Sequence, residues 1–275
     1  MTKVSTITPC YNMSKYLKGW LSNLSAQSHK DLEIILDHND PSEEEIKWVE
    51  DHNKKYNNIV HIQVDGVDPI ATSMNRCIEF AEGDYLCIWN VDDLRTSDSI
   101  ESMAKVLDEN EDIDIVYGNY TIVSSFGETH GQYVDIEPYI PELKTGMILG
   151  PYFMFRKSLI EKSGLFDEQF KTGADYDLAL RLVRNGKAYF MSHNLGYYLN
   201  EGKGSSTKPN SKQALERTAV ELRYGVRILD QSLVQSAKDN YDLDNITINE
   251  NKIPVYKFIP EELIIEELVH ASKSN

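Results

Sequence analysis

An apolar run that ends in two adjacent carboxylates is the feature that most constrains how this sequence can fold. Residues 85–89 carry no charge, the run stops at Asn90, and Asp92 and Asp93 follow. A run this short and dense is typical of a strand that is buried on both faces of a parallel sheet. The two aspartates would lie at its carboxyl end, where open α/β sheets bind their ligands.

Two interpretations of Asp92 and Asp93 stay open from these residues alone. Adjacent carboxylates repel each other, and a divalent cation that carries a phosphate-rich ligand would offset the repulsion. Asp is also a favoured capping residue, so the pair could instead cap a helix that begins near residues 96–98. The first interpretation predicts a ligand site, whereas the second predicts only a helix start.

The N-terminal part of the sequence alternates between strands and helices. Strands are predicted at residues 4–8, 32–36, 59–64 and 85–89, and helices at 14–26, 42–55, 70–82 and 97–110. This alternation predicts a parallel sheet with right-handed crossovers. Asp37 and Asp65 follow the second and third strands, so with Asp92 they would line one polar crevice if these strands are neighbours.

The C-terminal part is less regular. It predicts strands at residues 114–120, 148–155, 188–192 and 196–199, helices at 157–163, 175–185 and 211–237, and a hairpin near 126–128. A polar connector at 238–260 and a short amphipathic helix at 260–271 are predicted to follow. This last helix is too small to fold alone, so we expect it to dock on the body of the protein or to join two copies in a homo-oligomer.

Composition and charge argue against several classes of function. The formal net charge is −16, which argues against binding to nucleic acid or to anionic lipid. The three cysteines, Cys10, Cys77 and Cys87, have no metal-site spacing, and their odd number fits a reducing compartment. No apolar run approaches the roughly 20 residues of a membrane helix, and no basic leader precedes the first strand. We therefore expect a cytoplasmic protein without a transmembrane segment.

From about residue 3 to residue 206 the sequence resembles glycosyltransferase family 2, whose members have the GT-A fold. The segments that carry the resemblance are residues 4–12, 27–35, 75–85, 155–168 and 172–182. The sequence departs from the family pattern at Asn90, where Asp is frequent, at Ala174, where Glu is frequent, and at Met74, where Arg is usual. The loop that begins at Asp37 is also one residue shorter than the usual form.

The resemblance implies an α/β fold with a Rossmann-like nucleotide-binding, mostly parallel central sheet flanked by helices, and a C-terminal helical extension. The implied glycosyltransferase domain covers residues 1–206, with a nucleotide-sugar-binding half at 1–120 and an acceptor-side half at 121–206. The extension covers residues 207–275. Because the tail beyond about Ser236 lies outside the resemblance, we expect it to be dispensable for chemistry and to matter for assembly.

The resemblance also assigns chemistry to particular residues. Asp175 would be the general base for an acceptor hydroxyl, and Asp92, with Asp93 as second choice, would hold Mn²⁺ or Mg²⁺. The nucleotide sugar would be bound by Thr8, Pro9, Tyr11, Asp37, Asp65, Asn75, Asp92 and Lys203. Structural alternatives stay open: Asp175 as a helix cap, Asp37 as a turn residue, Tyr11 as a packed aromatic and Lys203 as a solvated loop residue.

The implied function is inverting, metal-assisted transfer of a sugar from a nucleotide-diphosphate sugar, with a UDP-sugar favoured. The acceptor would be a hydroxyl of a glycan or another molecule, as in polysaccharide biosynthesis. Asn90, Ala174 and Met74 favour the alternative of a non-catalytic or donor-binding protein with the same fold. A nucleotidyltransferase is a weaker alternative, because residues 8–12 lack the glycines and basic residues of a phosphate-binding loop.

Overall fold

The computed structural model describes residues 2–136, 149–202, 212–226 and 228–260. The chain divides into two compact units. The first unit comprises residues 1–139, 149–157 and 187–202, and the second comprises residues 140–148, 158–186 and 203–275. The domain boundary expected at residue 206 stays a prediction.

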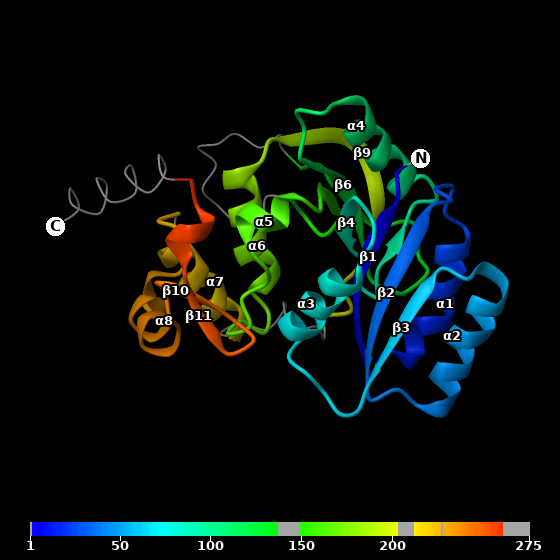
Figure 1. The fold of residues 1–275 in the computed structure, drawn as a ribbon, viewed down its shortest axis with the longest axis horizontal. Helices are drawn as coiled ribbons and strands as arrows, with labels where there is room; N and C mark the ends of the chain where they lie inside the picture. The colour runs from blue at the N-terminus through cyan, green and yellow to red at the C-terminus, as the bar shows by residue number, and fades with distance from the viewer. Residues whose placement is uncertain (1, 137–148, 203–211, 227, 261–275) are drawn as a thin grey trace. The chain divides into compact units, whose positions relative to one another are not determined.

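A mixed, mostly parallel sheet forms the centre of the first unit (Figure 1). Its strand order is β3-β2-β1-β4-β8-β6-β9-β5, and β7 pairs with β6. The strands are β1 Val4–Tyr11, β2 Leu32–Asn39, β3 Ile59–Val64, β4 Tyr85–Ile88, β5 Leu94–Arg95, β6 Ile115–Val123, β7 Gln132–Val134, β8 Phe153–Arg156 and β9 Ala188–Leu199. The first four strands are parallel, as predicted, whereas β8 runs antiparallel to both β4 and β6.

Helices cover both faces of the parallel part of the sheet (Figure 1). The helix α3, Ile70–Phe80, packs on one face, where the Cys77 thiol lies 3.4 Å from the Ile35 carbonyl oxygen. The helices α1 Ser14–Ser25, α2 Glu43–Tyr56 and α4 Ser99–Glu109 bury their apolar sides in the core on the other face. This division follows from the strand period of two, because Ile34 and Leu36 of β2 point into that core while Ile35 faces α3.

The start of α2 shows how local sequence fixes an element. The Ser42 hydroxyl accepts from the Glu45 N–H at 3.3 Å, and the Glu45 carboxylate accepts from the Ser42 N–H at 2.9 Å. This capping box satisfies N–H groups that the helix itself leaves unpaired. The helix ends at Tyr56 and is followed by Asn57, whose φ of 49° is left-handed. The predicted helix over residues 42–55 is therefore confirmed to within a residue.

The second unit contains short helices and a hairpin. Its elements are α5 Leu159–Ser163, α6 Ala174–Asn185, α7 Lys212–Arg223, the 3₁₀ turn η1 Gln231–Leu233, α8 Val234–Asn240, β10 Asn245–Ile248, β11 Asn251–Pro254 and the 3₁₀ turn η2 Val255–Phe258. At its centre, Arg223 forms ion pairs with Asp167 at 2.8 Å and with Asp177 at 2.7 Å, and all three side chains are buried.

Several predicted boundaries in the first unit are corrected by the structure. β2 does not end at residue 36 but continues to Asn39, because its last residues pair with β3 as far as Asn39 opposite Val64. The strands predicted at 188–192 and 196–199 are one strand, β9, which pairs with β6 across an irregular register. The hairpin expected near residues 126–128 is confirmed, because β6 and β7 pair antiparallel on either side of it.

Two other predictions in the second unit are wrong. The single helix expected over 211–237 is interrupted: α7 ends at Arg223, and Gly225 follows with a left-handed φ of 62°. The stretch 238–260, expected as a connector, contains the β10–β11 hairpin. The helix expected at 260–271 lies almost wholly outside the described residues.

Within the part of the chain that the structure describes, no helix combines the length and apolarity needed to cross a bilayer.

Candidate active site

The Asp92–Asp93 pair lies at the carboxyl end of β4, in a turn beside β1. The Trp89 N–H donates to the Ile7 carbonyl of β1 at 3.1 Å, and the Asp93 N–H closes the turn onto the Asn90 carbonyl at 3.2 Å. The chain then forms β5, and α4 begins only at Ser99. The interpretation that the two aspartates cap this helix is therefore wrong, because a strand separates them from it.

The two carboxylates have unequal surroundings. Asp93 is buried, and its Oδ1 accepts from the Leu199 N–H of β9 at 3.0 Å. Burial, followed by the charge of Asp92, raises the pKa of Asp93 to about 8. Asp92 is partly exposed, and burial together with the negative charge of Glu201 raises its pKa also. The pair is therefore a carboxylate site that is short of positive charge.

Arg95 lies close to this pair, and the sequence analysis did not single it out. Its guanidinium is buried, donates to the Ile88 carbonyl at 2.8 Å, and lies 5.3 Å and 5.0 Å from the ring centroids of Trp89 and Tyr152. It lowers the pKa of Asp93 slightly against the larger effect of burial. Among the described residues, Arg95 forms no ion pair with either aspartate. In the sequence, only its position two residues after Asp93 indicates that Arg95 lies near the carboxylate pair.

The side chains at this end of the sheet suit an oxygen-seeking cation without enclosing one. Asn90 could offer a cation only a neutral amide oxygen, whereas an aspartate at this position would offer a third negative charge. Among the described residues, no three His, Cys, Asp or Glu side chains are grouped so that they could hold a metal ion. Asp92 and Asp93 thus fit an ion such as Mn²⁺ or Mg²⁺ only if its remaining oxygen ligands come from another molecule, such as a diphosphate.

The carboxyl end of β1 lies next to the carboxyl end of β4, because the two strands are parallel neighbours. Thr8 and Pro9 lie within β1, and Pro9 is in register with Asp37 of β2. Tyr11 is 49% exposed, so it is not the packed aromatic of the structural alternative. Burial, and then the charges of Glu45, Asp37 and Asp92, raise the pKa of the Cys10 thiol to about 12. Negative charges from Asp37 and Asp92 therefore act together at the carboxyl ends of β1, β2 and β4.

Asp37 is neither a turn residue nor a free carboxylate. It lies within β2, is fully buried, and pairs with Arg76 of α3 at 2.7 Å. Its other oxygen accepts from the Asn39 amide at 2.7 Å. Arg76 also pairs with Asp68, and it is a residue that the sequence analysis missed. Asp37 is thus held by charge and hydrogen bonds at the edge of the predicted nucleotide site.

Of the remaining predicted donor residues, the structure describes Asp65 and Asn75. Asp65 follows β3 and is exposed, and Asn75 is buried on α3. Lys203 lies outside the described residues. Their roles in binding a nucleotide sugar stay predictions.

Asp175 and Asp177 occupy the first turn of α6 in the second unit. Asp177 is buried and contacts Arg181 at 2.6 Å, Arg223 at 2.7 Å and the Tyr224 hydroxyl at 2.8 Å. Asp175 is partly exposed, and its carboxylate accepts from the N–H of the next residue, Tyr176, at 2.8 Å. Burial raises the pKa of Asp175. In the described part of the chain, no cationic side chain pairs with the Asp175 carboxylate, and its role as a base stays a prediction.

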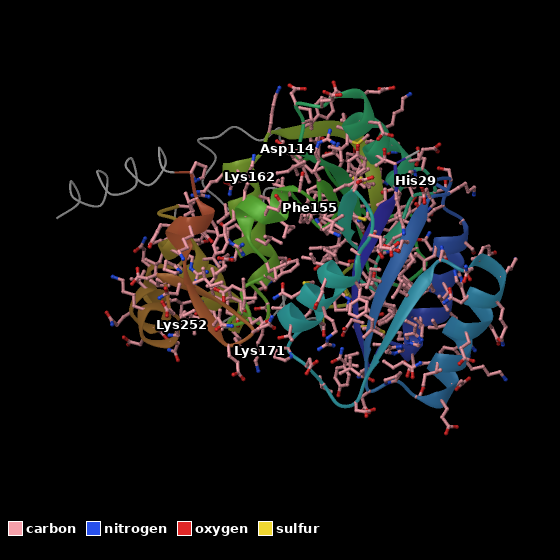
Figure 2. All side chains as sticks on the ribbon, viewed as in Figure 1. His29, Asp114, Phe155, Lys162, Lys171 and Lys252 are labelled. Carbon is pink, nitrogen blue, oxygen red and sulfur yellow. The ribbon has the colours of Figure 1, made fainter. Side chains whose placement is uncertain are left out.

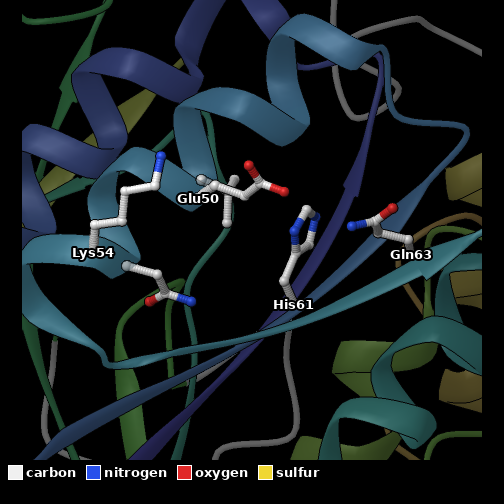
Figure 3. A pocket seen from close by; sticks show the side chains of 6 residues that line it. Glu50, Lys54, His61 and Gln63 are labelled. Atoms are coloured by element: carbon white, nitrogen blue, oxygen red, sulfur yellow. The ribbon is translucent and has the colours of Figure 1, made fainter.

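A pocket of about 340 Å³ lies elsewhere in the first unit, between α2 and the edge strand β3 (Figure 3). Its lining residues are Val49, Glu50, Asn53, Lys54, His61 and Gln63. None of the residues predicted to bind the donor lines it. The pocket is therefore separate from the candidate site at the end of β4.

Comparison with known proteins gives a consistent result. Residues 5–164 match the family described as glycosyl transferase family 2. An uncharacterized glycosyltransferase of Methanocaldococcus jannaschii, MJ1057, is 26% identical over 193 residues, which cover 66% of this chain and 65% of that protein. A glycosyltransferase of PGL/p-HBAD biosynthesis from Mycobacterium bovis is 25% identical over 230 residues, which cover 82% of this chain and 87% of that protein. The match spans only 32% of another relative, RC0461 of Rickettsia conorii.

Solved structures share the fold. S. aureus TarS 1–349 in complex with UDP-GlcNAc superimposes with a TM-score of 0.66 at 19% identity, over 97% of this chain and 71% of that chain. The mannosyltransferase PcManGT from Pyrobaculum calidifontis, in complex with GDP-Man and Mn²⁺, gives a TM-score of 0.56 at 13% identity, over 100% of this chain and 76% of that chain. At these identities the likeness shows a common GT-A-like α/β fold.

Proposed function

This chain belongs to glycosyl transferase family 2, and we propose that it transfers a sugar from a nucleotide-diphosphate sugar to a hydroxyl group with inversion at the anomeric carbon. The observation that carries the proposal is the carboxylate pair at the end of β4. Asp93 is buried there beside Asp92 with a pKa raised to about 8, which is the environment that a bound cation would relieve. In open α/β sheets, ligands bind at the carboxyl ends of the strands, which supports donor binding at the end of β4.

The proposed reaction has one displacement step. Asp175 accepts the proton of the acceptor hydroxyl as its oxygen bonds to the anomeric carbon of the donor. The bond from that carbon to the diphosphate oxygen breaks, and the nucleoside diphosphate leaves with the electron pair. One base and direct attack from the opposite face account for inversion. The raised pKa of Asp175 suits it to accept this proton.

Asp92 and Asp93 would hold a Mn²⁺ or Mg²⁺ ion. When bound, such an ion supplies positive charge that stabilises the leaving diphosphate. Tyr11 at the end of β1 and Asp65 after β3 are exposed, and we propose that these two residues contact the nucleoside. Asp37 and Thr8 are buried behind this surface, so we propose that they support the site without touching the nucleoside directly. A UDP-sugar is the favoured donor, because an Asp can accept from the N–H of a pyrimidine. The TarS complex with UDP-GlcNAc supports this choice.

Calorimetry of nucleotide binding tests the site assignment. UDP should bind weakly in EDTA and clearly with Mn²⁺, because a diphosphate approaching Asp92 and Asp93 is repelled unless a cation intervenes. Asp92→Ala should abolish the effect of Mn²⁺. The matched control is Asp84→Ala, which removes an exposed carboxylate just before the amino end of β4 and should leave Mn²⁺-dependent binding unchanged. Equal UDP affinity with and without metal would refute the cation site.

Turnover separates catalysis from donor binding alone. A panel of nucleotide sugars, scored for Mn²⁺-dependent release of nucleoside diphosphate, should identify at least one donor that is hydrolysed or transferred. Metal-dependent nucleotide binding without turnover of any donor, with or without glycan acceptors, would favour the donor-binding alternative to which Asn90 and Ala174 point.

A further inference from the structure

A buried glutamate of α7 holds the backbone from which α6 begins. Glu216 is fully buried, and its carboxylate accepts from the N–H groups of Lys171 at 3.0 Å, Thr172 at 2.6 Å and Gly173 at 2.9 Å. The Thr172 hydroxyl donates to the same oxygen at 2.8 Å. Successive backbone N–H groups that converge on one carboxylate form an anion nest. The Lys171 side chain itself is exposed (Figure 2).

This nest holds the three residues that lead into α6, up to its N-cap residue. Gly173 is the N-cap residue and has no side chain that could accept from the first turn. A Cβ atom at position 173 would lie 3.2 Å from the Glu216 Cβ, so the two elements pack closely here. The N–H groups before the helix are therefore satisfied by a residue more than forty positions later in the chain.

We propose that Glu216 is the positioning residue of Asp175: it fixes the segment from which this base projects and places a negative charge beside it. The inference rests on the proposed role of Asp175, which lies two residues after Gly173. Burial raises the pKa of Asp175, and the charge of Glu216 raises it further. Glu216 thus makes Asp175 more basic while it anchors the backbone on which Asp175 stands.

The other charged groups nearby are directed elsewhere. Asp177, on the same helix, pairs with Arg181 and with Arg223 of α7. Lys212 of α7 lies 3.7 Å from Glu216 Oε1, and the Tyr241 hydroxyl donates to that oxygen at 3.3 Å. Among the described residues, Glu216 is the charged group that shifts the pKa of Asp175.

The test compares Glu216→Gln with Glu221→Gln. In Glu216→Gln the amide oxygen can keep the position of Oε2, so the variant removes the charge and retains the hydrogen bonds that Oε2 accepts from residues 171–173. It loses only the acceptor at Oε1, which faces the Lys171 N–H and Lys212. Glu221 is equally buried on the same helix but accepts from the Leu229 N–H, away from the nest. Three measurements are made on both variants: the pH profile of kcat/KM, the ¹³C NMR titration of the Asp175 carboxyl, assigned with Asp175→Asn, and the thermal unfolding temperature.

For Glu216→Gln we expect the acidic limb of the pH profile and the NMR midpoint to move together to lower pH, because the negative charge beside Asp175 is removed. We expect kcat to fall with the donor KM unchanged. Glu216→Ala, which also removes the nest, should lower kcat by about 100-fold if it folds, because the base is no longer held in place. Glu221→Gln should leave both midpoints at the wild-type pH.

An unchanged NMR midpoint in Glu216→Gln would overturn the inference, as would an equal shift in Glu221→Gln. A loss of kcat that only follows a lower unfolding temperature, with an unmoved pH profile, would show a structural role and would also overturn it. The NMR titration needs no turnover. If the wild-type protein turns over no donor, the proposed function fails, while the titration still decides whether Glu216 controls Asp175.

Discussion

Two aspartates two residues apart on α6 have opposite surroundings. Burial alone would raise the pKa of Asp177, but Arg181 and Arg223 lower it overall. Asp175 has no such cations, and its pKa is raised. Divergent pKa values of neighbouring acids separate a structural carboxylate from one that can exchange a proton. The structure thus distinguishes two residues whose positions in the sequence look equivalent.

Asp175→Asn should lower the rate of sugar transfer by at least about 100-fold, because the amide cannot accept the acceptor proton. Donor binding and the unfolding temperature should stay near wild type, since no described ion pair is lost. Asp177→Asn is the structural contrast: it should destabilise the protein by about 3–5 kcal/mol, because buried Arg181 loses its carboxylate partner and Arg223 keeps only Asp167. An Asp175→Asn variant that keeps more than a tenth of the wild-type rate would show that another group is the base.

His61, which lines the pocket of Figure 3, lies against the buried His38, and this contact makes stability depend on pH. His61 Nε2 lies 3.2 Å from His38 Nδ1, and burial, with the nearby His38, lowers the pKa of His61 from 6.5 to about 4. The unfolded chain takes up this proton at higher pH than the folded one. The contribution of His61 is therefore complete above about pH 6.5 and is lost as the pH falls towards 4.

His61→Gln should make the free energy of unfolding less sensitive to acid. Between pH 6.5 and pH 4 the wild type should lose on the order of 1 kcal/mol more than the variant. Urea unfolding at several pH values measures the difference. His130→Gln, on the exposed turn between β6 and β7, is the control and should follow the wild-type curve. Parallel curves for wild type and His61→Gln would contradict the assignment.

At the scale of elements, the interruption after α7 depends on one glycine. Gly225 has a φ of 62°, and nothing lies within 4 Å of a Cβ placed there. Gly225→Ala should cost about 1 kcal/mol of unfolding free energy through backbone strain alone. Gly225→Asn should cost less, because Asn tolerates the left-handed region. Equal losses in chemical denaturation for Ala and Asn would show that the conformation of this turn is not what limits stability.

The elements that sequence periodicity predicts well are those whose partners are close in the chain. The alternation of β1 to β4 with α1 to α3 follows from local apolar patterns, and so does the position of Asp92 at a strand end. The antiparallel insertion of β8 between β4 and β6 does not, because the order of strands depends on contacts between distant segments. The same limit explains why Asp37 was placed in a turn: β3 extends β2 by pairing, and nothing near Asp37 in the sequence signals this.

The site residues show the same division between local and distant information. Asp93 follows a local pattern, but the Leu199 N–H that holds it belongs to a strand more than one hundred residues later. Arg76 lies on a predicted helix, yet its pairing with Asp37 depends on the packing of α3 against β2. Glu216 lies beyond the segments that carry the family resemblance. Single-sequence analysis therefore identifies the candidate reactive groups better than the groups that position them.

At the scale of the whole molecule, the two proposed chemical roles belong to different compact units. Asp92 and Asp93 are held within the sheet of the first unit, and Asp175 is held within the second unit by α7. The second unit in turn depends on the segment after residue 240. Arg223 donates to the carbonyls of Asp242 at 2.6 Å and Asn245 at 2.9 Å. The sequence analysis treated this segment as a connector.

The length of chain needed for activity follows from these contacts. A chain that ends at Ser236 was expected to keep its chemistry, but it would lack the Tyr241 hydroxyl that contacts Glu216 and the Thr247 N–H that donates to Asp167 at 2.8 Å. We now expect this truncation to destabilise the second unit and to abolish sugar transfer, because buried charged groups lose hydrogen bonds worth about 1.5–3 kcal/mol each.

A chain that ends at Pro260 retains these contacts and should keep the wild-type transfer rate. Thermal unfolding and donor turnover on both truncations test the expectation, and Thr247→Pro, which deletes a single N–H donor, should give an intermediate loss of stability. Mn²⁺-dependent UDP binding reports separately on the first unit and should survive in any truncation that leaves the sheet folded. Full transfer activity in a stable chain ending at Ser236 would show that the hairpin is not required to hold the base, and the original expectation would stand.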